Sequence, residues 1–149
     1  MSAGIFGLLA HPTKMREQYH HWQGRSGQWW VTTVYPLMAA HIDLPSVYVM
    51  VHRDSSGKAH PLYIGQADDT ARRMREHATS KLLAAWLLGG NELHLHLLAK
   101  TEAERFAIET DLRNAHAAPL NKQPTEAGEL SGLLGYGLRL NGLGSALGR

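Results

Sequence analysis

The chain has 149 residues, 44% of them hydrophobic, which suits one packed domain with short extensions. The absence of cysteine excludes a disulfide framework and a thiolate metal site, and it fits a cytoplasmic protein. A formal charge of +2 is too small to indicate nucleic-acid binding by itself. The apolar run at residues 3–11 is shorter than a membrane-spanning helix requires, so we expect no membrane association.

Residues 1–45 are mixed in character, and we expect an N-terminal extension packed on or beside the main domain. Segment 13–24 is polar and aromatic and favours a short helix, whereas segment 27–36 is rich in β-branched and aromatic residues and predicts a strand. Aromatic runs in these segments indicate core or interface packing, with stacking on single-stranded DNA as the alternative. They are His20-His21-Trp22 and Trp29-Trp30.

Residues 46–124 carry the pattern of the main domain. A run of β-formers at 46–54 and a second strand at 60–65 flank the Ser- and Gly-containing turn 55–58, which predicts an antiparallel hairpin. Segment 92–100 alternates between polar and apolar residues and predicts a third strand.

Helices are predicted between and after these strands. Asp68 or Asp69 is a suitable N-cap for a helix over 70–78, whose apolar residues share one face. A second helix over 81–88 follows Thr79 or Ser80 and ends at a Gly-Gly pair. The apolar residues of the first helix are Ala71, Met74 and Ala78.

The clearest helix covers residues 101–116. Thr101 and Glu104 have the spacing of a capping box, and Ile108, Leu112 and Ala115 form the apolar face. The remaining tail, 125–149, is rich in Gly and Leu, and we expect loops there or a segment that needs a partner.

Four residues then stand out by their order and spacing. Tyr48 lies in the first strand of the hairpin, and Tyr63 begins the sequence Tyr-Ile-Gly in the second. Arg73 follows ten residues after Tyr63, and His77 lies one helical turn beyond Arg73 on the same face. Taken singly, each is more often core filler or a solvated surface group.

Glu109 on the last helix and Asn121 behind Pro119 complete the set, and together the six residues resemble the GIY-YIG nuclease family over Ser46 to about Lys122. The resemblance implies a small three-stranded antiparallel sheet flanked by helices, an α/β (α+β) fold with which the predicted elements are compatible. The small residue Ser46 stands where the family has its first glycine.

The resemblance also implies a metal-dependent endonuclease that hydrolyses DNA, double- or single-stranded. Glu109 would bind one Mg²⁺ or Mn²⁺, a hard cation suited to a carboxylate oxygen, and Arg73 would offer its planar donor fork to the phosphate. Tyr48 would act as general base, with His77 accepting its proton, because a phenol is a poor base at neutral pH. Tyr63 would position water or phosphate.

The remaining charged residues have weaker claims. Asn121 would tie the last helix to the site or to the phosphate, and Arg72 and Arg75 would contact the DNA backbone or remain solvated. Further cations are more often plain surface charge, namely Arg53, Lys58, Lys81 and Lys122. His94 and His96 share a strand face, which we expect to be solvated or substrate-facing because no third metal ligand is identifiable.

Two other hypotheses compete with the endonuclease. The first is a non-catalytic nucleic-acid-binding module with the same fold, and the second is a structural protein in which the six residues coincide by chance. No zinc finger, helix-turn-helix or long basic arm is evident, so specificity would come from residues 1–45, the tail or a second subunit. A monomer with one site would nick one strand at a time, so a double-strand break would favour a homodimer or sequential nicks.

Overall fold

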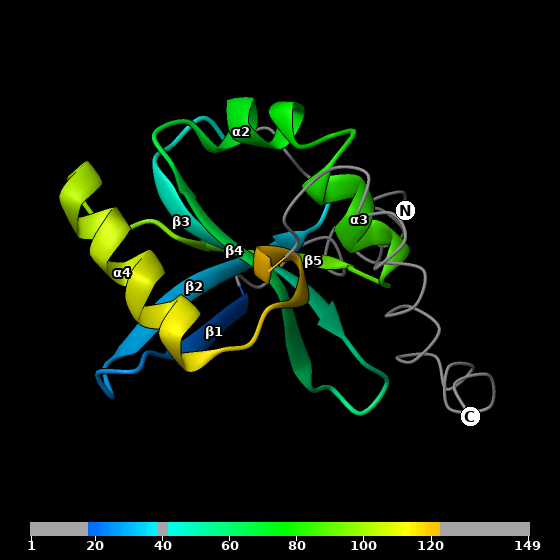
Figure 1. The fold of residues 1–149 in the computed structure, drawn as a ribbon, viewed down its shortest axis with the longest axis horizontal. Coiled ribbons are helices and arrows are strands. Elements are labelled where there is room, and N and C mark those ends of the chain that lie inside the picture. Colours follow the sequence, from blue (N-terminus) through cyan, green and yellow to red (C-terminus); the bar gives the residue numbers. More distant parts are fainter. Residues whose placement is uncertain (1–17, 39–41, 123–149) are drawn as a thin grey trace, which may run out of the picture.

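The computed structural model describes residues 18–38 and 42–122, which form an α+β domain built on one five-stranded sheet (Figure 1). The strands are β1 (Gln18–Gln23), β2 (Trp29–Pro36), β3 (Ser46–Arg53), β4 (Ala59–Ala67) and β5 (Glu92–His96). The helices are α2 (Thr70–Glu76), α3 (Lys81–Leu87) and α4 (Glu102–Ala115), followed by the 3-10 helix η1 (Pro119–Lys122). The predicted α+β class is confirmed, while the predictions for residues 1–17 and for the tail lie outside the described residues.

Every pairing in the sheet is antiparallel, and the strand order is β1-β2-β5-β3-β4. The three strands predicted for the main domain are present as β5, β3 and β4, which are neighbours with β3 in the centre, and the strand predicted at 27–36 is present as β2. The expected size of three strands was wrong, because β2 pairs with β5 from Thr33↔Leu95 to Pro36↔Glu92 and brings β1 with it. Residues 18–36 therefore belong to the same sheet as the strands of the main domain.

The segment Gln18–Gln23 is a strand and not the short helix that its composition suggested. It pairs with β2 along its whole length, and Asp111 of α4 holds the turn between them. The Asp111 carboxylate accepts hydrogen bonds from the backbone N–H of Ser26 at 2.8 Å and from Trp30 Nε1 at 2.9 Å. The conformation of β1 thus depends on partners distant in the sequence, which a local pattern does not contain.

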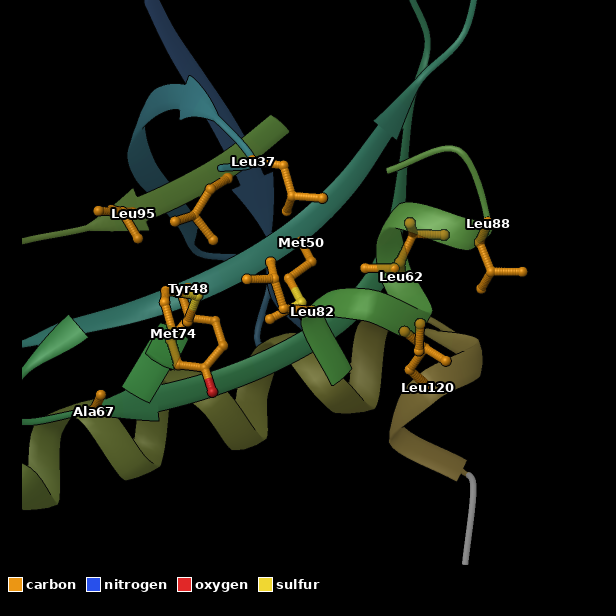
Figure 2. Packing of buried hydrophobic residues seen from close by; sticks show 13 residues of the cluster. Leu37, Tyr48, Met50, Leu62, Ala67, Met74, Leu82, Leu88, Leu95 and Leu120 are labelled. Atoms are coloured by element: carbon orange, nitrogen blue, oxygen red, sulfur yellow. The ribbon is translucent and has the colours of Figure 1, made fainter. Parts of the chain in front are cut away.

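Different helices cover the two faces of the sheet. Tyr48 on β3 packs with Met74 of α2 and Leu82 of α3 in one hydrophobic cluster (Figure 2). On the other face, Val49 of the same strand packs with Ile108 of α4. Because successive side chains of a strand point to opposite faces, β3 supplies both cores and is almost fully buried.

The predicted caps of α2 and α4 are present. The side chain of Asp69 accepts from the N–H of Arg72 at 3.0 Å, and Thr101 accepts from the N–H of Glu104 at 3.1 Å. The apolar faces of both helices are shorter than expected. Ala78 lies beyond the end of α2 and is exposed, and Ala115 is the last residue of α4 and is also exposed.

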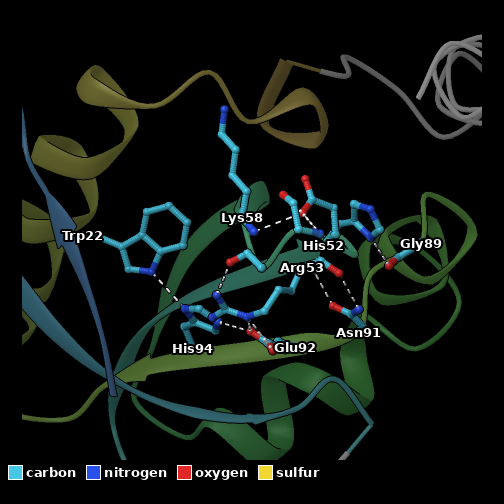
Figure 3. Close-up of polar contacts among 11 residues, drawn as sticks. Trp22, His52, Arg53, Lys58, Gly89, Asn91, Glu92 and His94 are labelled. Atoms are coloured by element: carbon cyan, nitrogen blue, oxygen red, sulfur yellow. Dashed lines mark hydrogen bonds and ion pairs between the residues drawn. The ribbon is translucent and has the colours of Figure 1, made fainter. Parts of the chain in front are cut away.

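A buried polar network joins β1 to β5 and β3 (Figure 3). Trp22 Nε1 donates to His94 Nδ1 at 3.0 Å, and His94 Nε2 donates to the Glu92 carboxylate at 2.8 Å. Arg53 Nε donates to the same carboxylate at 2.9 Å. Desolvation by burial lowers the pKa of His94 to about 4, so this imidazole is neutral at physiological pH.

The expectation that His94 and His96 lie on a solvated or substrate-facing side of the strand was therefore wrong. Both are buried on the face covered by α4, where His96 Nδ1 donates to the carbonyl of Val31 at 2.7 Å. Each imidazole takes part in holding the N-terminal hairpin to the rest of the sheet.

Candidate active site

Tyr48 and Gly65 lie opposite each other on β3 and β4, and the Tyr48 ring lies directly over the glycine. A Cβ atom on Gly65 would be 2.5 Å from the Tyr48 hydroxyl and 2.6 Å from Cζ, distances that no side chain tolerates. The glycine of the Tyr-Ile-Gly sequence is therefore required for space. Its absent side chain lets the phenol reach across β4.

The Tyr48 hydroxyl is 2.8 Å from Nε2 of His77, the residue that caps α2. Tyr63 lies beside both, with its ring centroid 6.0 Å from that of Tyr48 and 5.5 Å from that of His77. Tyr48 is completely buried, whereas Tyr63 and His77 are half-buried. A ligand would thus reach this cluster from the side of Tyr63 and His77.

The pKa values of both phenols are raised. Desolvation by burial is the main cause at Tyr48, reinforced by the nearby Tyr63, and it is also the main cause at Tyr63, reinforced by the charge of Glu109. Tyr48 is therefore a neutral phenol at physiological pH and not a standing phenolate base.

Two hydrogen-bonded contacts attach the start of α2 to the strand that carries Tyr48. Ser46 and Thr70 share a hydrogen bond of 2.7 Å between their hydroxyls, and the N–H of Thr70 donates to the carbonyl of Leu44 at 3.1 Å. With the Tyr48–His77 bond at the other end, the whole seven-residue helix is anchored to β3. Ser46 is fully buried at this contact.

The three arginines of α2 have different surroundings. Arg72 forms ion pairs with Asp68 and Glu76 and is half-exposed, and Arg75 is exposed. The charge of Arg73 lowers the pKa of both Tyr48 and Tyr63, against the effect of burial. Its Nε is buried without a hydrogen bond, although Glu76 Oε2 lies 3.2 Å away, because the two groups are poorly aligned.

Glu109 lies on α4, the helix that covers the face of the sheet opposite to the tyrosines. Its side chain is 14% exposed and lies 3.4 Å from Arg113, and its charge acts on Tyr48, Tyr63 and Arg73. Desolvation by burial raises the pKa of Glu109 despite these cations. Within residues 18–38 and 42–122, no three His, Asp or Glu side chains are grouped as a metal site.

Asn121 forms two hydrogen bonds to the outer edge of β4. Its Oδ1 accepts from the N–H of Ile64 at 2.9 Å, and its Nδ2 donates to the carbonyl of Ile64 at 2.8 Å. Ile64 precedes Gly65, so this amide holds the strand where the Tyr48 ring crosses it. Lys81 donates to the carbonyl of Leu120 in the same segment at 3.0 Å and lies 5.6 Å from the centre of the Tyr63 ring.

One residue near the site was missed by the sequence analysis. Arg105 is only 6% exposed and donates through Nε to Gln66 Oε1 at 3.3 Å. Its place in the buried stripe with Ile108 and Leu112, at i, i+3 and i+7, was a usable signal.

No family model, curated protein or solved structure matches the chain, so the resemblance rests on the residues themselves. None of the helices in the described part of the chain is long and apolar enough to cross a membrane.

Proposed function

We propose that the protein is a metal-dependent endonuclease of the GIY-YIG type that hydrolyses DNA. The observation that carries this proposal is the hydrogen-bonded pair of Tyr48 and His77, which crosses Gly65 and lies beside Tyr63. A purely structural role, in which Tyr48 only fills the core, would explain the burial of the ring. It does not explain why the hydroxyl is directed to an imidazole across a strand that must carry glycine.

Proton transfer from water to the tyrosine–histidine pair would run as a relay. A water entering beside Tyr63 would give its proton to the Tyr48 oxygen while Tyr48 gives its own proton to His77 Nε2. A relay of this kind suits a phenol of raised pKa, because no free phenolate forms. In this arrangement His77 is the base, and Tyr48 is the group through which it acts.

Arg73 and Glu109 supply the electrostatic part of the mechanism. The buried, unbonded Nε of Arg73 is a donor that a phosphate oxygen would satisfy. Desolvation by burial raises the pKa of Glu109, and a divalent cation held by Glu109, waters and the phosphate would stabilise its charged form. Such a cation, Mg²⁺ or Mn²⁺, would supply stabilisation of the charge that develops on the phosphate.

Supercoiled plasmid and a labelled single-stranded oligonucleotide, each with Mg²⁺ or with chelator, test this proposal. We expect cutting with metal and none with chelator, and loss of at least about 100-fold in rate for Glu109→Ala, in the range seen when one electrostatic group is removed. Asn114→Ala, at an exposed position of the same helix, is the matched control. Binding without cutting under every condition would support the non-catalytic module instead.

A further inference from the structure

Arg105 is an unusual residue because its charge is buried without an acidic partner. Its side chain lies in the apolar stripe of α4, and among the described residues that side chain forms one hydrogen bond, to the neutral Gln66. No carboxylate among the described residues lies within ion-pair distance of it. An arginine is almost never buried unless it is paired, so the fold leaves this cation in need of an anion.

A polar cavity of about 260 Å³ lies next to this guanidinium. Arg105 lines it together with Arg72 and Arg73 of α2, and two acids also face it, Asp68 and Glu102. Arg72 already pairs with Asp68 and lowers the pKa of that carboxyl. Three arginines and two acids line the cavity, and Glu76 Oε2 also lies 3.2 Å from Arg73 Nε. Arg105 is therefore the lining arginine that forms no ion pair among the described residues.

Arg73 connects the cavity to the candidate active site. It lines the cavity, and its charge also acts on Tyr48 and Tyr63. Two guanidiniums from different helices that meet in one polar cavity match the oxygen-rich surface of a phosphate group.

We infer that the cavity bounded by Arg72, Arg73 and Arg105 holds the phosphate that neighbours the cleaved one along the DNA strand. This inference rests on the proposed function, because it takes the phosphate beside Tyr63 and His77 as the one that is cut. A free inorganic phosphate has the same chemistry, and the experiment separates the two sources.

The test compares the full chain with Arg105→Gln, Arg105→Lys and the control Arg25→Gln, an exposed arginine of the β1–β2 turn. Binding of labelled oligonucleotides is measured in chelator over a series of salt concentrations. We expect Arg105→Gln to weaken binding and to reduce the slope of log affinity against log salt by about 0.7–0.9, the value for one lost phosphate contact. Arg105→Lys should keep the slope, and Arg25→Gln should match the wild type.

Oligonucleotides that carry one neutral methylphosphonate at successive positions identify the phosphate. The wild type should lose affinity when the methylphosphonate replaces the phosphate beside the cut. The affinity of Arg105→Gln should not change when that same phosphate is replaced. If Arg105→Gln responds to every position as the wild type does, the inference is overturned. A second pair of results would also overturn the inference. In it, inorganic phosphate raises the thermal midpoint of the wild type but not of Arg105→Gln, and both proteins bind the oligonucleotides with equal affinity.

Thermal unfolding separates a binding role from a structural one. We expect Arg105→Gln to unfold at the same temperature as the wild type or above it, since it removes an unpaired buried charge. If that variant fails to fold, the methylphosphonate scan is carried out with Arg105→Met, a neutral side chain of similar length, which should be indifferent to the position beside the cut. Cleavage that depends on Glu109 but not on Arg105 overturns this inference alone, whereas absence of any nucleic-acid binding overturns the proposed function as well.

Discussion

Gly65 lies so close beneath the Tyr48 ring that its missing Cβ atom would be 2.5 Å from the phenol oxygen. The backbone at this glycine is an ordinary strand without positive φ, so the residue is needed for the space it leaves and not for its conformational freedom. The same close approach places the hydroxyl 2.8 Å from His77, on the helix that follows β4.

Gly65→Ala tests this close approach. The added methyl group would push the Tyr48 ring out of a fully packed site, and we expect a loss of about 1–3 kcal/mol in the free energy of unfolding, as for overpacked cores. Chemical denaturation measures it. Tyr48→Leu should remove part of that penalty, so the double variant should be less destabilised than the sum of the two. Strict additivity would mean that the ring and the glycine are not in contact.

The raised pKa of Tyr48 gives a pH dependence of stability. The unfolded chain would ionise this phenol near its ordinary pKa of 10.0, whereas the folded chain resists ionisation to a higher pH. The contribution of Tyr48 to the free energy of unfolding is therefore fully present below pH 10 and falls as the pH rises above 10. Tyr48→Phe should lose stability less steeply between about pH 10 and 11.5 in thermal scans. Tyr19→Phe, at an exposed position, should follow the wild type, and equal slopes for all three would contradict the shift.

Arg73 and Arg75 form a natural matched pair, because they lie on the same short helix and only Arg73 acts on the tyrosines. We expect Arg73→Ala to reduce the cleavage rate by at least about 100-fold, the cost of one transition-state charge contact, with a modest loss of binding. Arg75→Ala should change binding by no more than a surface charge does. Single-turnover rates and equilibrium binding with the same oligonucleotide measure both, and equal activity of the two variants would refute the role of Arg73.

Asn121 is expected to act through the strand it holds. Removing its amide in Asn121→Ala leaves the N–H and carbonyl of Ile64 without their partner, which should cost about 1–3 kcal/mol in stability. Asn121→Asp should be destabilised as well, because one carboxylate oxygen can accept from the N–H but the other faces the carbonyl. A variant of unchanged stability that binds DNA poorly would instead indicate direct contact with the substrate.

The central elements could be predicted from the sequence because their signals are local. The hairpin of β3 and β4 was predicted from two runs of β-formers around a Gly turn, and α4 from its cap at Thr101. The proximity of Tyr48, Tyr63 and His77 was implied by the family resemblance, and the structure brings the three side chains together.

Features that depend on partners distant in the sequence could not be predicted from local patterns. Segment Gln18–Gln23 is polar and aromatic, and it forms a strand because β2 and Asp111 hold it. His94 is buried although its strand alternates, because Trp22 and Glu92 satisfy both of its nitrogens. Arg105 has no local signal of charge burial other than its place in an apolar stripe.

The attachment of α2 to the sheet determines which residues of this helix can be substituted in order to alter ligand preference. A seven-residue helix has little stability alone, and here both its ends are fixed by the bonds of Ser46 and Tyr48 to residues of the helix or its cap. The outward positions 72, 75 and 76 can therefore be randomised in a library without loosening the buried side of the helix. Selection at those three codons is a direct route to variants with altered ligand preference.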